Sequence, residues 1–197
     1  MIKTVLFDYA GVISSTKNNY IFAVKNCKRF GLTPKELMQI TYEDWDKAAV
    51  GELKKNVFWK QIANKLRIEP KKLKQLVINT FPINKKMVEI IKKTKKNYIT
   101  VLFSNQVKDW LEKVVDDNKI RDVFNYFVNS YNVGVRKPDK KIFFEALRIT
   151  KSKPEETLLI DDSPENIKAA IKLGINVIEF KNFKQFLVQY KKFIDIN

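Results

Sequence analysis

The sequence contains no histidine and only one cysteine, Cys27, among its 197 residues. Without histidine, the chain cannot form a Ser-His-Asp or Cys-His catalytic set, nor the two-histidine zinc site of the metalloproteases. A single thiol is too little for a thiolate metal site or an internal disulfide framework, and it fits a reducing compartment. The polar chemistry of an active site must therefore come from carboxylates, hydroxyls, amides, amines and a hard metal ion.

Long hydrophobic runs are also missing. No stretch of about 18 apolar residues is present, so we expect neither a transmembrane helix nor a membrane partner. Residues 1–8 are apolar only briefly before a charge, which predicts that they are not a signal peptide. The hydrophobic fraction of 45% suits an ordinary core. We predict a folded cytoplasmic protein, either a monomer or a small homo-oligomer, with one domain and a modest insertion.

The formal net charge of +16 raises the question of nucleic-acid binding. The basic residues are mostly lysines spread along the chain, with local runs at residues 71–74 and 92–96. Such runs are typical of solvated helix faces, and charge alone supports only nonspecific binding. We therefore predict no specific nucleic-acid partner. The same charge would attract anionic substrates.

Short apolar runs alternate with helical patterns over most of the chain. The expected strands are residues 4–8, 98–103, 126–128, 157–160 and 175–178, and the expected helices are residues 84–96, 106–118, 139–150 and 163–173. Strands that alternate with helices of this length are typical of a parallel sheet. The pattern predicts an α/β fold with a Rossmann-like core.

Local signals mark the ends of several helices. Thr33 to Glu36 and Ser152 to Glu155 have capping-box spacing, and Ser163 stands directly before a proline. Gly174 follows the helix that it is expected to terminate. Near the end of the chain, apolar residues recur every three or four positions and predict an amphipathic helix: Phe183, Phe186, Leu187, Tyr190 and Ile194. We expect this helix to pack on the sheet, with a basic membrane-surface helix as the alternative.

Residues 14–82 have a different character. They show helical periodicity and many aromatic residues but no convincing strand. This pattern predicts a small helical insertion after the first strand, with residues 1–13 and 83–197 forming the α/β core. We interpret most of its aromatic residues as packing groups. The loose candidates for substrate contact are Tyr20, Tyr42, Trp45 and Glu52.

Polar residues stand at the ends of three expected strands: Asp8, Ser104-Asn105 and Asp161-Asp162. A fourth polar group, residues 134–139, lies in the loop before a helix. Open parallel sheets bind ligands outside the carboxyl ends of their strands, so we expect these four groups to converge. Three clustered carboxylates would repel one another unless a cation joined them. An all-oxygen site of this kind suits Mg²⁺.

These segments resemble, in order, the four motifs of haloacid-dehalogenase-like hydrolases. The matching segments are residues 7–12, 104–105, 136–138 and 160–166, and the resemblance spans essentially the whole chain. It implies a small helical cap at residues 14–82 and a magnesium-dependent phosphatase that acts on a small phosphorylated metabolite, such as a sugar phosphate. It also implies that Asp8, Asp162 and the Ala10 carbonyl bind the metal. Asp161 would be a further ligand or a supporting partner, and Asn166 would support the metal carboxylates.

The resemblance also assigns roles in the reaction. Asp8 would attack phosphorus and form an aspartyl-phosphate that water then hydrolyses. Ser104 and Asn105 would bind the phosphoryl group, and Arg136 would lie near the substrate. Lys137 would offset the negative charge of the nucleophile and the phosphate, and it would bind the phosphate as well.

The sequence departs from the family pattern at Ala10, where a second aspartate usually acts as the general acid. A branch that includes enzymes resembling α-D-glucose-1-phosphate phosphatase also lacks this aspartate and still hydrolyses phosphates. Leaving groups of low pKa need the acid least, which favours activated phosphomonoesters. Two alternatives stay open: a pseudo-phosphatase that binds a phosphorylated ligand or partner, and a haloacid dehalogenase. The dehalogenase needs no metal, and the twin aspartates argue against it.

Overall fold

The computed structural model describes residues 1–195, and these contain one sheet of five parallel strands in the order β3-β2-β1-β4-β5. This sheet confirms the predicted α/β fold with a Rossmann-like core. The register places Phe7 of β1 opposite Leu102 of β2 and Ile160 of β4, so the three central strands end close together. The strands are β1 (Thr4–Phe7), β2 (Ile99–Ser104), β3 (Tyr126–Asn129), β4 (Thr157–Asp161) and β5 (Asn176–Glu179).

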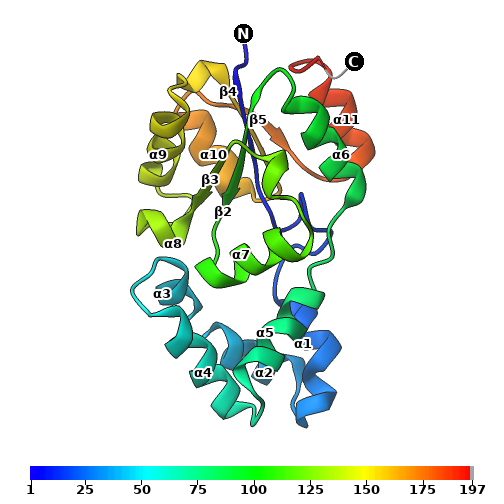
Figure 1. The fold of residues 1–197 in the computed structure, drawn as a ribbon, viewed down its shortest axis with the longest axis vertical. Helices are drawn as coiled ribbons and strands as arrows, with labels where there is room; N and C mark the ends of the chain where they lie inside the picture. The colour runs from blue at the N-terminus through cyan, green and yellow to red at the C-terminus, as the bar shows by residue number, and fades with distance from the viewer. Residues whose placement is uncertain (196–197) are drawn as a thin grey trace.

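Helices cover both faces of the sheet (Figure 1). Successive side chains of a strand point to opposite faces. Accordingly, Val5 and Phe7 join one buried cluster with α6 (Lys85–Thr94), α7 (Lys108–Asp117) and α11 (Phe183–Tyr190). Leu6 joins a second cluster with α9 (Lys140–Thr150) and α10 (Pro164–Lys172). The strands are therefore buried on both sides, as their continuous apolar sequences require.

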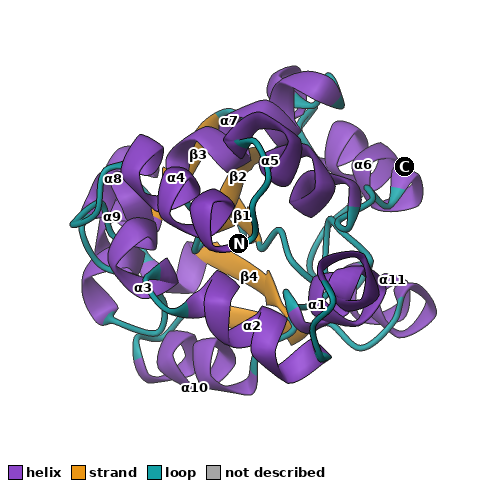
Figure 2. Cartoon of the chain, turned by 90° about the horizontal axis from the view of Figure 1, so that it is seen from below, coloured by secondary structure: helices purple, strands orange, loops and turns teal. Residues whose placement is uncertain are grey.

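The segment between β1 and α6 is helical, and its residues 15–82 contain no strand. Its helices gather at one end of the sheet, which Figure 2 shows from below. They are α1 (Tyr20–Asn26), α2 (Pro34–Tyr42), α3 (Trp45–Ala49), α4 (Lys55–Lys65) and α5 (Pro70–Asn79), with a 3₁₀ turn at Cys27–Phe30. The division of the chain into a core and a separate cap at residues 14–82 stays a prediction.

The chain passes between the sheet and the helical segment twice, and the two crossings lie side by side. Ser14 forms an antiparallel bridge with Ile83, and the Asn84 N–H donates to the Ile13 carbonyl at 2.8 Å. Farther along, the Thr16 hydroxyl donates to the Thr80 carbonyl at 2.7 Å. These hydrogen bonds join the start of the helical segment to its end.

Most of the predicted helix ends are confirmed. Thr33 and Glu36 form a full capping box at the start of α2, and Gly174, with φ of 79°, follows the last residues of α10. The capping box predicted at Ser152 is wrong. The N-cap there is Lys153, whose N–H donates to Glu156, and it starts a 3₁₀ turn at Pro154–Glu156. The Ser152 hydroxyl instead hydrogen-bonds the Thr4 hydroxyl at 2.7 Å, a tertiary contact that local spacing cannot reveal.

Two further differences concern element boundaries. The first strand ends at Phe7, so Asp8 lies just beyond it, and a short helix that the periodicity did not predict, α8 (Ser130–Val133), follows β3. The Asn129 side chain accepts a hydrogen bond from the Tyr131 N–H and starts this single turn. Gly134 ends it in the left-handed conformation. A third 3₁₀ turn covers Arg121–Val123.

The helix predicted near the end of the chain packs on the sheet. Phe186 and Tyr190 of α11 are fully buried, and the Tyr190 ring lies 6.4 Å from that of Phe7 in β1. The Tyr190 hydroxyl hydrogen-bonds Thr94 of α6 at 2.7 Å. No helix within residues 1–195 combines the length and the apolar character needed to cross a membrane.

This packing predicts how α11 responds to truncation of its side chains. Phe186→Ala removes a fully buried ring and should lower the free energy of unfolding by about 3–5 kcal/mol. Val188→Ala on the same helix is the matched control. Its side chain is 61% exposed, so its effect should stay within about 0.5 kcal/mol. Equal losses for the two variants in urea unfolding would contradict this packing of α11.

Candidate active site

The candidate site begins where β1 ends. Phe7 is the last residue of the strand, and the Asp8 N–H donates to the Ile160 carbonyl of β4 at 3.0 Å. This bond fixes the Asp8 backbone at the carboxyl edge of the sheet. The Asp8 side chain is almost fully buried, and its Oδ1 accepts a hydrogen bond from Lys137. Within residues 1–195, Oδ2 has no such partner.

Lys137 is the centre of the site. Its ammonium group donates to Asp8 Oδ1 at 2.8 Å, to Asp161 Oδ2 at 2.8 Å and to the Phe103 carbonyl at 2.9 Å. These three bonds use all three N–H groups of the lysine. The ammonium therefore joins the ends of β1, β2 and β4, although the lysine itself comes from the loop after α8.

Asn105 holds that loop in place. Its side-chain Oδ1 accepts from the Lys137 N–H at 2.8 Å, and its Nδ2 donates to the Lys137 carbonyl at 2.9 Å. The sequence predicted Asn105 as a phosphate-binding residue. In the structure both ends of its amide are bonded to the Lys137 backbone, so Asn105 positions the lysine.

The twin aspartates at the end of β4 differ in their surroundings. Asp161 is fully buried, and it accepts hydrogen bonds from the Ser163 N–H and from Asn166, in addition to Lys137. The Asp162 side chain is 13% exposed. Its contact with the Lys17 ammonium, at 3.6 Å, is longer than the 2.8 Å contact between Asp161 and Lys137. Asp162 is thus the more available of the two carboxylates.

Electrostatics separates these groups further. Burial raises the pKa of Asp8 to about 7, although the neighbouring Lys137 opposes this shift. Burial also raises the pKa of Asp162, with a further contribution from the charge of Asp161. For Lys137, burial alone would lower the pKa, but Asp161 and Asp8 together raise it above its usual value. The ammonium is therefore held in its charged form.

The carboxylates of Asp8, Asp161 and Asp162 fit a divalent metal ion. One oxygen from each lies within 4.8 Å of the others. The Lys137 ammonium and the more distant Lys17 ammonium together do not balance three ionised carboxylates, and the set offers only the oxygen ligands that Mg²⁺ prefers. Asp8 and Asp162 have oxygens available for a metal, whereas both oxygens of Asp161 already accept hydrogen bonds. Asp161 and Asn166 therefore suit a supporting role.

The site opens into a cleft of about 570 Å³. The structure brings most of the predicted site residues to this cleft: Asp8, Ala10, Ser104, Asn105, Arg136, Lys137, Asp162 and Asn166. Asp161 lies beneath its wall and does not line it. The Ser104 hydroxyl makes no hydrogen bond within residues 1–195, which leaves it available to a ligand. The role of the Ala10 carbonyl as a metal ligand stays a prediction.

The helical segment supplies the opposite wall of the cleft. Of the four loose candidates, Tyr42 and Trp45 line the cleft with their rings stacked 5.5 Å apart, whereas Tyr20 and Glu52 do not line it. Arg136 reaches across to Asp46 of α3 in a solvent-exposed ion pair of 3.1 Å.

Several further residues line the cleft: Asp139, Ser163 and Glu165 lie within the predicted segments 134–139 and 160–166, whereas reasoning from sequence missed Lys17, Asn18, Asn19 and Gln106. Gln106 directly follows the predicted motif residues 104–105, and this adjacency is the signal that could have identified it. Residues 17–19 belong to a polar run in the first crossing, and nothing in their spacing indicates a site.

The chain is similar in sequence to several known proteins. The sequence profile of the family described as haloacid dehalogenase-like hydrolase matches residues 5–180. Glyceraldehyde 3-phosphate phosphatase of Pyrococcus furiosus is 30% identical over 111 residues, which cover 54% of this chain and 45% of that enzyme. D-ribitol-5-phosphate phosphatase of Bacteroides thetaiotaomicron is 25% identical over 194 residues, which cover 92% and 93% of the two chains. The chain thus spans less than half of the first relative and nearly all of the second.

Solved structures share the fold over most of the chain. A HAD family enzyme of Bacteroides thetaiotaomicron, crystallised in complex with magnesium and inorganic phosphate, superimposes with a TM-score of 0.75. The identity is 24%, and the match covers 92% of this chain and 95% of the other.

A glycine next to the site provides a test of its geometry. Gly11 has φ of +83°, and a Cβ atom there would lie 2.3 Å from Asp162 Oδ2. Gly11→Ala should therefore cost about 1–3 kcal/mol of stability for its backbone conformation and also displace the Asp162 carboxylate. We expect the affinity for Mg²⁺, measured by calorimetry, to fall at least about tenfold.

Gly31→Ala is the matched control. Gly31 also has a positive φ, of +64°, but a Cβ atom there would meet nothing within 4 Å. Its stability loss in denaturant should be similar, and its Mg²⁺ affinity should not change. If both variants bind Mg²⁺ as the wild type does, the placement of Asp162 as a metal-binding carboxylate is wrong.

Proposed function

The chain belongs to the haloacid dehalogenase-like hydrolase family, and we propose that it is a magnesium-dependent phosphatase that acts on a small phosphorylated metabolite through an aspartyl-phosphate. The observation that carries this proposal is the buried Asp8 carboxylate, bonded to the Lys137 ammonium and grouped with Asp161 and Asp162 at an open cleft. Two relatives are named as phosphatases of phosphorylated three- and five-carbon compounds. These names favour a sugar or polyol phosphate as the substrate.

Asp8, Lys137 and Ser104 have different roles in the proposed reaction. A carboxylate oxygen of Asp8 attacks phosphorus, so a bond forms between Asp8 and phosphorus while the bond to the leaving oxygen breaks. Water then attacks the same phosphorus, which releases inorganic phosphate and restores the Asp8 carboxylate. Lys137 holds Asp8 in one orientation and stabilises the charge on the transferring group. The free Ser104 hydroxyl is placed to hydrogen-bond a phosphoryl oxygen.

Asp8, Asp162 and the Ala10 carbonyl would hold the magnesium ion, with Asp161 and Asn166 supporting them. When bound, Mg²⁺ offsets the negative charges of the carboxylates and the phosphate so that they can approach one another. Asn105 acts on this chemistry indirectly, because it fixes the backbone of Lys137.

The general acid is the one missing part. Ala10 lines the cleft two residues after the nucleophile and cannot donate a proton. Substrates whose leaving oxygen has a low pKa, such as aryl, acyl or anomeric phosphates, need this proton least. We therefore infer faster turnover of such activated phosphates than of simple alkyl phosphates. Ala10 also favours a second candidate function, a pseudo-phosphatase that binds phosphorylated ligands without hydrolysing them.

Metal dependence tests the first proposal. Hydrolysis of p-nitrophenyl phosphate should fall to background in EDTA and return when excess Mg²⁺ is added, because the three carboxylates cannot approach a phosphate without a counter-ion. Asp8→Asn protein, assayed with Mg²⁺, measures the background. Undiminished turnover in EDTA would contradict the metal-dependent mechanism.

Substitution at Asp8 and Ala10 separates an active enzyme from a pseudo-phosphatase. Asp8→Asn removes the nucleophile and should lower kcat by at least about 10³-fold. Ala10→Asp installs a carboxyl group near the leaving oxygen and should raise kcat for an alkyl phosphate by up to about 10²-fold, with a smaller gain for an aryl phosphate. The comparison needs kcat for both substrates in the wild type and in both variants.

Two outcomes would change the conclusion. If the wild type is inactive on both substrates and Ala10→Asp creates activity, the chain is a pseudo-phosphatase. If Asp8→Asn retains wild-type activity, the assignment of the nucleophile is wrong.

A further inference from the structure

One helix of the helical segment, α3, packs directly on α8, the short helix that follows β3. Ser130, the first residue of α8, is fully buried, and its hydroxyl donates to the carbonyl of Ala49, the last residue of α3, at 2.6 Å. Just beyond α3, a Cβ atom on Gly51 would lie 3.0 Å from the Tyr131 carbonyl oxygen. The end of α3 is therefore in close contact with the start of α8.

The Ser130 hydroxyl makes a second hydrogen bond, to the Gln106 N–H, from which it accepts at 3.1 Å. A hydroxyl has one hydrogen to donate and two lone pairs that accept. The Ala49 carbonyl, at 2.6 Å, is closer to this hydrogen than the alternative acceptor, Asn129 Oδ1, at 3.4 Å. A continuous series of hydrogen bonds therefore runs from the Gln106 N–H through the Ser130 hydroxyl to the end of α3.

Gln106 belongs to the phosphate segment, the name used here for residues 104–106. In the proposed reaction the Ser104 hydroxyl binds a phosphoryl oxygen, and the Asn105 amide fixes the backbone of Lys137. Gln106 is buried, and a buried backbone N–H needs an acceptor. The acceptors of the Gln106 N–H therefore set the position of the segment that carries both groups.

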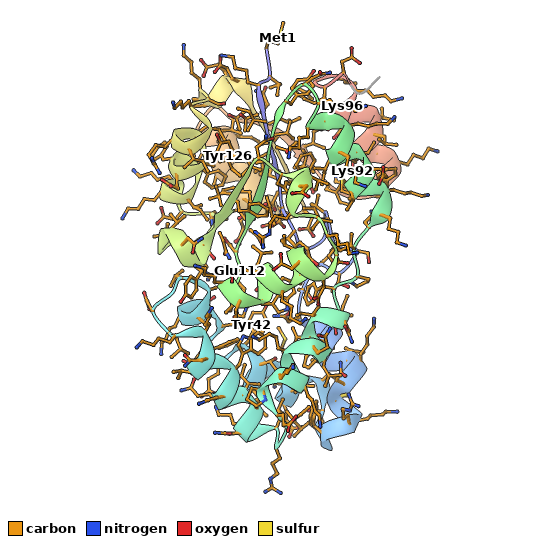
Figure 3. All side chains as sticks on the ribbon, viewed as in Figure 1. Met1, Tyr42, Lys92, Lys96, Glu112 and Tyr126 are labelled. Atoms are coloured by element: carbon orange, nitrogen blue, oxygen red, sulfur yellow. The ribbon has the colours of Figure 1, made fainter. Side chains whose placement is uncertain are left out.

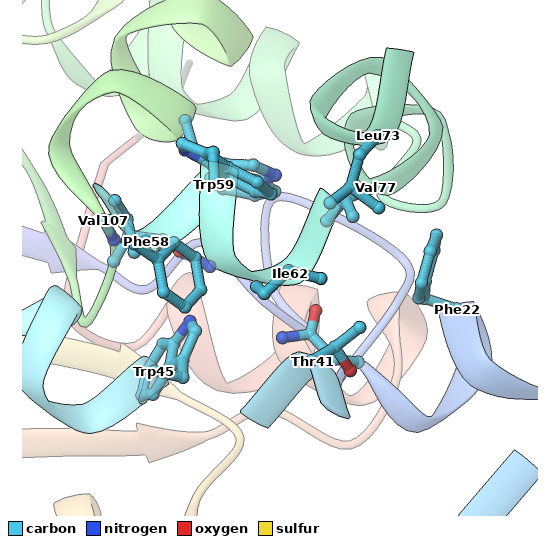
Figure 4. A pocket seen from close by; sticks show the side chains of 12 residues that line it. Phe22, Thr41, Trp45, Phe58, Trp59, Ile62, Leu73, Val77 and Val107 are labelled. Atoms are coloured by element: carbon cyan, nitrogen blue, oxygen red, sulfur yellow. Dashed lines mark hydrogen bonds between the residues drawn. The ribbon is translucent and has the colours of Figure 1, made fainter. Parts of the chain in front are cut away.

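The helix α3 also meets the phosphate segment at a small cavity. This cavity has a volume of about 20 Å³ and lies between the helical segment and the start of α7, and the described residues that line it are all uncharged. Trp45 of α3 lines it together with Gln106 and Val107, and Figure 4 shows Trp45, Phe58 and Val107 on one side of it. Trp45 and Gln106 line the catalytic cleft as well. The packing of α3 thus affects the surroundings of the phosphate segment on two sides.

We propose that Ser130 is a positioning residue that couples the packing of α3 on α8 to the geometry of the phosphate segment. If α3 separates from α8, the Ser130 hydroxyl loses its acceptor and turns to Asn129 Oδ1. That oxygen is the second acceptor of the Gln106 N–H, at 3.2 Å, so the two donors then compete for it. The phosphate segment therefore holds its binding geometry only while α3 is packed on α8. This inference rests on the proposed phosphatase function.

Removal of the hydroxyl tests the proposal. In Ser130→Ala, the Kd for inorganic phosphate, measured by calorimetry with saturating Mg²⁺, should rise at least about fivefold, which corresponds to one hydrogen bond. The Kd for Mg²⁺ alone should change less than about twofold, because Asp8 and Asp162 follow β1 and β4 and are not bonded to the phosphate segment. Ser152→Ala is the matched control. It also removes a buried hydroxyl, bonded to Thr4, and should leave both affinities unchanged.

A second variant tests the same coupling from the side of the helical segment. Gly51→Ala places a Cβ atom against the Tyr131 carbonyl and should move the end of α3 away from α8, while no residue of the cleft is changed. The Kd for phosphate should again rise at least about fivefold, with the Kd for Mg²⁺ unchanged. Gly31→Ala is the control, because Gly31 also has a positive φ but a Cβ atom there meets nothing within 4 Å. It should bind phosphate as the wild type does.

The results separate this inference from the function on which it rests. Wild-type phosphate affinity in Gly51→Ala would overturn the inference even if Ser130→Ala does not fold, and so would wild-type affinity in Ser130→Ala. Equal losses of phosphate and Mg²⁺ affinity in Ser130→Ala, or an equal loss in Ser152→Ala, would also overturn it and show a purely structural role. A wild type that neither binds nor hydrolyses phosphate would instead refute the proposed function.

Discussion

The architecture of this protein depends on the position of one buried ammonium group, that of Lys137. It is bonded to Asp8 after β1, to the Phe103 carbonyl in β2 and to Asp161 at the end of β4. Three strands that are separate in sequence therefore meet at one cation. The backbone of the lysine is fixed in turn by the Asn105 amide. Because every N–H of the ammonium has an acceptor, the buried charge is compensated and the site is rigid. Figure 3 draws the side chains on the ribbon, with Tyr42 labelled in the helical segment.

This arrangement also explains why the site requires a further cation. Lys137 compensates only part of the charge of three neighbouring carboxylates, and burial raises the pKa values of Asp8 and Asp162. A divalent ion would reduce the repulsion among these carboxylates. The oxygens available to it belong to Asp8 and Asp162, because hydrogen bonds do not occupy all of their oxygens. The fold thus gives the three carboxylates different surroundings. Both oxygens of Asp161 accept hydrogen bonds, one of them from Lys137, whereas Asp8 and Asp162 keep oxygens that are available to a metal ion.

The two spaces above the sheet edge differ in polarity. The cleft at the phosphate end has charged walls, and the smaller cavity between the helical segment and α7 has none. The net charge of +16 acts at longer range, since it raises the local concentration of anionic substrates without providing specificity.

The sequence by itself determined the fold class, the strand and helix pattern, and the set of polar residues that converge at the sheet edge. These features follow from periodicity and from the rule that parallel strands end at one edge, both of which are local or topological. The tertiary structure decided which groups are bonded to which. Asn105 binds the backbone of Lys137, and Ser152 bonds Thr4 across the fold instead of capping a helix.

Only the structure showed that Asp161 is buried while Asp162 is partly exposed. Asp161 and Asp162 are adjacent in sequence and chemically identical. Their difference arises because successive residues at a strand end point in different directions, one into the core and one toward the cleft. Residue type and spacing cannot express that direction, since it depends on what the rest of the chain packs against each side chain.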